Sequence, residues 1–178
     1  EEKNDLHAAF ALKLQQFHQR GKLKLKQKEV LQLLHRMEQL ATQQDWKVET
    51  VVAHHYLVFE KFSQKEIPTE WVYTEALNTY RRMEELGFEQ FKDYQLEGIL
   101  LELGQFMYGL EDFENMFLFL SVAERFIQFT ESGQYSTILI LNHLEAYFQQ
   151  KKDYPKAIEY AQKILHFSRQ LVTSHPET

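Results

Sequence analysis

The sequence predicts an all-α fold built from antiparallel helix hairpins, and two observations support this prediction. Glycine (6) and proline (3) together make up nine of the 178 residues, whereas these two residue types average about 12% of a protein. So few turn-forming residues cannot supply the tight turns of a β-sandwich or the glycine-rich loops of a nucleotide-binding α/β fold. Apolar residues also recur at spacings of three and four almost throughout the chain, which is the helical period.

This periodicity predicts eight helices joined by short connections. The expected helices span residues 3–19, 26–43, 47–63, 70–86, 90–108, 113–130, 135–150 and 155–172. Candidate N-cap residues precede three of them, namely Thr69, Asp112 and Asp153. Glycines that we expect to end a helix in the left-handed conformation follow four of them, namely Gly21, Gly87, Gly109 and Gly133.

Short connections also predict how the helices pair. Connections of a few residues place consecutive helices side by side and antiparallel. We therefore expect four hairpins within a single helical-repeat domain that covers residues 1–178, and these hairpins span residues 3–43, 47–86, 90–130 and 135–172.

The stretch 141–165, LNHLEAYFQQKKDYPKAIEYAQKIL, resembles the tetratricopeptide repeat, a helix–turn–helix unit of about 34 residues. By position, Leu144 matches the first leucine of the repeat and Phe148 its tyrosine. Ala157 matches the small residue at which the two helices touch. Glu145 stands where the pattern has glycine, which predicts a looser helix contact than in a consensus unit.

Two further matches lie earlier in the chain. Within residues 100–123, Leu103-Gly104 fits the leucine–glycine pair of the repeat, Met107-Tyr108 its aromatic pair and Asp112-Phe113 its turn. Met116 then takes the small-residue position, and Ala123 takes that of the late alanine. A weaker match places Ala76 at the small-residue position of the hairpin 47–86. The resemblance implies a right-handed superhelix of stacked hairpins, in which large side chains such as Leu144, Phe148 and Tyr154 fill the grooves beside close helix contacts. The alternative is a closed helical bundle that serves as a structural or self-association module.

The residues of the chain do not predict a catalytic or metal site. The chain has no cysteine, which excludes disulfides, thiol catalysis and thiolate zinc sites. The eight histidines include no pair one helical turn apart, and the adjacent His54 and His55 cannot both face one ion. No serine lies in a strand–turn–helix elbow, and no glycine-rich phosphate loop is present. We expect neither an enzyme nor a cofactor-binding protein.

Charge and hydropathy restrict the class of partner. Residues 20–28 carry five basic residues and no acid, whereas residues 84–114 carry nine acids and one lysine. The acidic stretch argues against direct binding to nucleic acid. No apolar run approaches the length of a membrane span. We expect a soluble chain, and the composition is compatible with either the cytoplasm or the periplasm.

The resemblance implies a protein- or peptide-binding scaffold. Members of the family line a groove with the first helix of each hairpin. The corresponding positions here are Thr50, His54, Leu57, Leu101, Gln105, Tyr108, Asn142, Ala146 and Gln149. The basic residues with which relatives clamp a terminal carboxylate are not at these positions. The degenerate repeats and aromatic-rich helices resemble the sensory or interaction part of larger bacterial signalling or transcription-regulatory proteins. A homodimer is a further expected arrangement.

Overall fold

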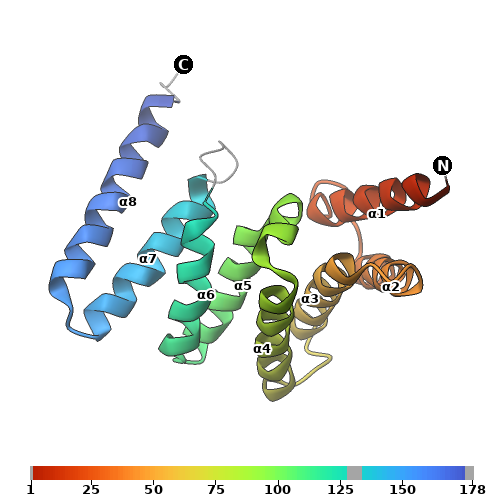
Figure 1. Cartoon of the computed structure of the whole chain (residues 1–178), viewed down its shortest axis with the longest axis horizontal. Coiled ribbons are helices and arrows are strands. Elements are labelled where there is room, and N and C mark those ends of the chain that lie inside the picture. Colours follow the sequence, from red (N-terminus) through yellow and green to blue (C-terminus); the bar gives the residue numbers. More distant parts are fainter. Residues whose placement is uncertain (1, 128–133, 175–178) are drawn as a thin grey trace. The chain divides into compact units, whose positions relative to one another are not determined.

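The computed structural model of the chain describes residues 2–127 and 134–174, and the side chains of residues 5–127 and 135–169. Within these ranges the protein is all-α, with eight α-helices, one 3₁₀ helix and no strand (Figure 1), which confirms the predicted fold class. No helix in the described ranges combines the length and the apolar character needed to cross a membrane. The chain divides into two compact units, unit 1 (Glu1–Phe91) and unit 2 (Lys92–Thr178).

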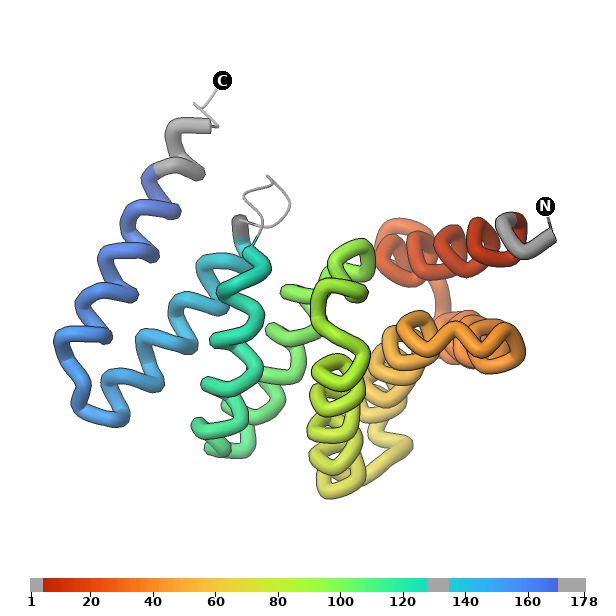
Figure 2. The backbone as a smooth tube through the Cα atoms, in the orientation of Figure 1, coloured from red at the N-terminus to blue at the C-terminus, as the bar shows by residue number. Residues whose placement is uncertain are grey.

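Most helices lie within one or two residues of the predicted ranges, and Figure 2 follows them along the backbone. The helix predicted over residues 113–130 instead ends at Arg125. Unit 1 contains α1 (Glu2–His18), α2 (Gln27–Gln43), α3 (Lys47–Ser63) and α4 (Thr69–Leu86). The 3₁₀ helix η1 (Phe88–Tyr94) crosses from unit 1 into unit 2. Unit 2 then contains α5 (Leu96–Gly109), α6 (Phe113–Arg125), α7 (Gln134–Gln150) and α8 (Tyr154–Ser174).

The prediction of one helix over residues 90–108 is wrong at its beginning. Residues 88–94 form η1, and Gln95 adopts the left-handed conformation with φ 57° before α5 begins. Phe91 and Leu96 are both fully buried. In a continuous α-helix, residues five apart would point about 140° away from each other. The break therefore allows both side chains to be buried.

The core of unit 1 forms around α3, which packs against both α2 and α4. The helix α2 buries one face through Val30, Leu34, Met37 and Ala41, at the spacing of an amphipathic helix. The helix α1 covers α3 with aromatic contacts, of which the Phe17 and Tyr56 ring centroids lie 4.8 Å apart. Near its N-terminal end, the His7 ring stacks on Trp46 at 3.6 Å.

The core of unit 2 contains the close helix contact that the repeat pattern predicts. A Cβ built on Gly104 of α5 would lie 2.5 Å from Cδ2 of the buried Leu120 of α6. A larger residue at position 104 would therefore require the Leu120 side chain or the two helices to shift. Leu144 and Phe148 of α7 are buried, as is Ala157 of α8.

The prediction that Tyr154 fills a groove is wrong. Its side chain is 60% exposed, although Tyr160 on the same helix is buried. Residues six apart lie about 120° apart around a helix. Tyr154 therefore points away from the face that α8 packs on α7.

Five turns share one backbone geometry, and two of them, at Lys24 and Lys65, follow α1 and α3 with φ of 53° and 60°. Asp45 after α2, Glu111 after α5 and Lys152 after α7 are left-handed, with φ of 55°, 59° and 59°. The next residue in each turn donates its N–H to a carbonyl five residues earlier, as in Trp46 to Ala41 at 2.9 Å. The equivalent bonds join Asp112 to Met107 and Asp153 to Phe148. This is the Schellman arrangement, here formed by residues other than glycine.

Four glycines were expected to end helices in this conformation. Gly87 follows α4 with a positive φ of 88°, but its ψ of 120° lies outside the left-handed helical region, so that prediction is confirmed only in the sign of φ. Gly21 and Gly109 do not have positive φ, and the left-handed residues are Lys24 and Glu111. Gly133 lies outside the described residues.

Two of the three predicted N-caps are confirmed. Asp112 accepts a hydrogen bond from the N–H of Asn115 at 3.2 Å. Asp153 accepts one from the N–H of Lys156 at 3.3 Å. The prediction for Thr69 is wrong, because Thr69 is the first residue of α4 and Pro68, which has no side-chain donor or acceptor, occupies the cap position.

Candidate binding surface

The residues predicted to line a groove are divided between the two units. Thr50, His54 and Leu57 lie on α3 of unit 1, and the others lie on α5 and α7 of unit 2. Leu57 and Leu101 are only 3% and 7% exposed. Both side chains belong to a core, so they offer no surface to a ligand.

His54 lies between two carboxylates that come from neighbouring helices. Its Nδ1 lies 2.7 Å from Oε1 of Glu38 on α2. Its Nε2 lies 3.0 Å from Oε2 of Glu75 on α4. All three side chains are largely buried, with exposed fractions of 25%, 26% and 18% for His54, Glu38 and Glu75. We call this group the His54 cluster.

The carboxylates favour the charged form of the imidazole. A carboxylate only accepts hydrogen bonds, so a ring that donates from both nitrogens is the doubly protonated imidazolium. The hydrogen bond to Glu38, followed by the one to Glu75, raises the pKa of His54 although its burial opposes this. The same bond holds the pKa of Glu38 below its ordinary value, with smaller contributions from His35 and Lys61.

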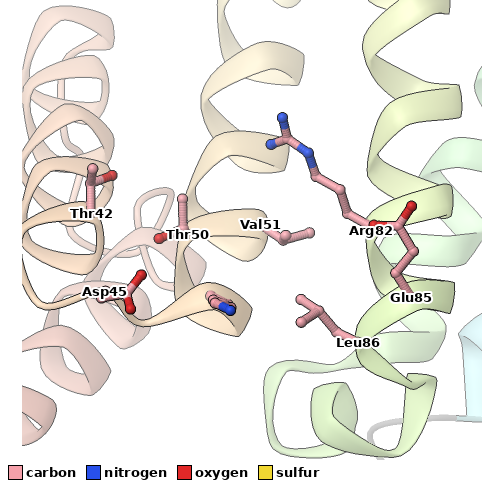
Figure 3. A pocket seen from close by; sticks show the side chains of 8 residues that line it. Thr42, Asp45, Thr50, Val51, Arg82, Glu85 and Leu86 are labelled. Atoms are coloured by element: carbon pink, nitrogen blue, oxygen red, sulfur yellow. The ribbon is translucent and has the colours of Figure 1, made fainter.

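A cavity of about 310 Å³ opens between the C-terminal end of α2, the N-terminal end of α3 and the C-terminal end of α4. Its lining combines hydroxyl, apolar and charged side chains (Figure 3): Thr42, Asp45, Lys47, Thr50, Val51, Arg82, Glu85 and Leu86. The cavity thus contains Thr50, one of the predicted groove residues.

The chemistry of the cavity separates into a floor and a rim. Val51 is buried and Leu86 is half-buried, so they form an apolar floor. The guanidinium of Arg82 points from α4 toward α3 (Figure 3). Neither Arg82 nor Lys47 forms an ion pair with another residue of the described part of the chain. Asp45 and Glu85 supply hydrogen-bond acceptors on the same exposed rim.

The cavity and the His54 cluster occupy successive turns of the same helices. Thr42 follows Glu38 by four residues on α2, and Thr50 precedes His54 by four residues on α3. Residues four apart lie on the same face of a helix. A second cavity of about 220 Å³ is lined by Glu38, Gln39, Thr42 and Gln43. Glu38 and Thr42 therefore connect the cluster to the cavities.

In unit 2 the predicted residues lie on a more open surface. The rings of Tyr108 on α5 and His143 on α7 have centroids 4.9 Å apart. Burial lowers the pKa of His143, which favours its neutral form. The side chains of Gln105 and Asn142 are exposed. Gln149 is also exposed, and its amide donates to Glu145 within α7.

The His54 cluster is arranged for hydrogen bonding. Its two carboxylates engage opposite nitrogens of one ring, and the doubly protonated imidazole that they favour has no lone pair for a metal or a substrate proton. Nowhere in the described ranges do three or more histidine and carboxylate side chains gather in a way that could hold a metal ion.

Sequence reasoning found His54 and Thr50 but missed their partners. Glu38 and Glu75 lie 16 and 21 residues from His54 in the chain. No local spacing signals such contacts, because they depend on which helix faces pack together. The same holds for Arg82 of the cavity rim.

Comparisons with protein-family models, curated proteins and solved structures give no match for this chain. The relationship to the tetratricopeptide repeat therefore remains a resemblance of the residue pattern.

Proposed function

We propose that the protein is a protein- or peptide-binding scaffold, and that the cavity of unit 1 receives a short segment of its partner. The observation that carries the proposal is a cavity of about 310 Å³ with an apolar floor and with cations at its rim that form no ion pair within the described part of the chain. Ligand sites typically combine a mostly apolar lining with a few polar groups that fix orientation.

The lining suits an extended peptide that inserts one apolar side chain. Val51 and Leu86 can contact such a side chain, while Arg82 and Lys47 can donate hydrogen bonds to backbone carbonyls or to an acidic residue. The hydroxyl of Thr50 donates to the carbonyl of Trp46 at 2.7 Å, so its oxygen is left to accept a bond from a peptide N–H.

The wider context rests on the resemblance alone. We propose that this scaffold is the interaction or sensory part of a larger bacterial signalling or transcription-regulatory protein. The proposed role for this segment is binding without catalysis.

Two adjacent arginines provide the test of the cavity. Arg81 and Arg82 are both exposed on α4, but only Arg82 lines the cavity. Peptides would be selected from a displayed random library against the intact chain, and their affinity measured for Arg82→Glu and, as the matched control, Arg81→Glu. We expect Arg82→Glu to weaken binding at least about tenfold, the effect of one charged hydrogen bond. Equal affinity of the two variants, or a library that yields no binder, would refute the proposed site.

A second candidate function is self-association through α8. Tyr154, Ile158 and Leu165 lie along one side of this helix and are 60%, 57% and 50% exposed. Exposed apolar side chains gathered on one face are a common feature of interfaces. Sedimentation velocity over a concentration series tests this candidate. A dimer that Ile158→Lys dissociates supports it, whereas a monomer at all concentrations excludes it.

A further inference from the structure

The His54 cluster connects three helices through a single side chain. Glu38 lies on α2, His54 on α3 and Glu75 on α4, so the imidazole joins α3 to both of its neighbours. Asn78 also donates to Glu75 at 3.4 Å. The cluster therefore contributes to the spacing between α2, α3 and α4, in addition to stabilising each helix.

Other charged groups near the cluster are few. His35 on α2 and Lys61 on α3 act on Glu38, and the two carboxylates are the charged groups that act on His54. The helix α1 also packs on α3, but its ionic contacts are made elsewhere, from His7 to Glu49 and from Arg20 to Glu60. The protonation state of His54 is thus the main variable within the cluster.

Protonation decides how many helices the ring can join. An imidazolium donates to both carboxylates, whereas a neutral imidazole carries one N–H and can donate to only one of them. Loss of the proton removes the imidazole donor from the other carboxylate, in a largely buried position where a less well paired charge is unfavourable. The contact of α3 with either α2 or α4 is then weakened.

We propose that protonated His54 is a pH-dependent clamp that holds α2, α3 and α4 at the spacing that forms the cavity one helical turn away. Thr42 on α2 and Thr50 on α3 both line the cavity. Thr42 lies one helical turn from Glu38, and Thr50 lies one helical turn from His54. When the clamp releases, these walls separate and the cavity loses its shape.

The direction of the pH effect follows from the two shifted groups. The pKa of His54 is raised above 6.5, so its stabilisation is complete below pH 6.5 and is lost as the pH rises through the folded-state value. The pKa of Glu38 is lowered below 4.5, so its contribution is present above pH 4.5 and is lost as the pH falls through the lower folded-state value. The clamp is therefore closed in mildly acidic solution and open at alkaline pH.

The first measurement is the titration of the His54 ring by NMR in the intact chain, assigned from the resonance missing in His54→Gln. We expect an apparent pKa above 6.5 that falls in Glu38→Gln and, by a smaller amount, in Glu75→Gln. The order reflects the shorter bond to Glu38, 2.7 Å against 3.0 Å. A His54 pKa at or below 6.5 would overturn the proposal.

The second measurement reports the spacing of the helices directly. Because the chain has no cysteine, spin labels can be placed uniquely at Gln39→Cys on α2 and Thr74→Cys on α4, which are exposed neighbours of Glu38 and Glu75. We expect pulsed electron paramagnetic resonance to give a narrow distance distribution at pH 5.5 and a broader or longer one at pH 9. In the His54→Gln background the distribution should be broad at both values.

The control is His166→Gln, which replaces an exposed histidine of unit 2. This variant should keep the pH response of the spin-label distances. A distribution that is the same at both pH values while His54 titrates would refute the clamp. Because neither measurement uses a ligand, the clamp and the peptide-binding proposal can fail independently of each other.

Discussion

Gly104 shows how one residue sets the distance between two helices. Alanine there would place its Cβ 2.5 Å from Cδ2 and 2.6 Å from Cγ of Leu120, a side chain that is fully buried. We expect Gly104→Ala to lower the free energy of unfolding by about 1 to 2 kcal/mol, because overpacking outweighs the gain in helix propensity.

Gly98 on the same helix is the matched control for this prediction. A Cβ there would meet only Cβ of Gln95, at an ordinary 3.8 Å. Gly98→Ala should therefore stabilise the protein by about 0.5 to 1 kcal/mol through helix propensity. Urea unfolding monitored by circular dichroism measures both variants. Equal effects of the two substitutions would show that the Leu120 contact does not control the packing.

At the scale of the element, the turns that follow α2, α5 and α7 place charged residues in the left-handed conformation. This conformation costs a residue with a Cβ about 1 kcal/mol relative to glycine. We expect Lys152→Gly, at φ 59°, to raise the free energy of unfolding by about 0.5 kcal/mol, since the greater flexibility of unfolded glycine offsets part of the gain.

Gln150, the last residue of α7, provides the comparison for the turn. Gln150→Gly should destabilise the protein by up to about 1 kcal/mol, because glycine is a poor helix former. The two substitutions are two residues apart and differ in the sign of their expected effect. A destabilising Lys152→Gly would show that the lysine side chain contributes more than its backbone conformation costs.

The helices could be predicted because apolar residues recur at helical spacing along most of the chain, and most helices lie within one or two residues of the expected ranges. Their ends were harder to predict. Gly109 was expected to end α5 in the left-handed conformation, but Glu111 adopts it two residues later. The position of that residue depends on the backbone hydrogen bond from Asp112 to Met107, which pattern reasoning does not detect.

The site was predictable only in part, for a related reason. The resemblance to the tetratricopeptide repeat placed Thr50 and His54 on the groove face of a helix, but it also placed Leu57 there, which the core buries. Exposure depends on how far the neighbouring helix extends over that face. The carboxylates that face His54 come from other helices, so their identity follows from packing alone.

At the scale of the whole molecule, every residue of the cavity and of the His54 cluster lies in unit 1. Compact units with their own buried core often fold independently. We expect the fragment 1–91 to unfold cooperatively and to retain the raised His54 pKa of the intact chain. Circular dichroism and NMR titration of the fragment test this. A fragment that is unfolded, or whose His54 titrates near 6.5, would show that unit 1 depends on the rest of the chain.

The stack of His7 on Trp46 allows tryptophan fluorescence to report on the docking of α1. The chain has two tryptophans, of which Trp46 is 7% exposed and Trp71 is 41% exposed. In Trp71→Phe the fluorescence comes from Trp46 alone, so its emission should be that of an indole shielded from water. Release of α1 would remove His7 and Phe10 from the indole and shift the emission to longer wavelength. The wavelength of maximum emission therefore reports whether α1 is docked.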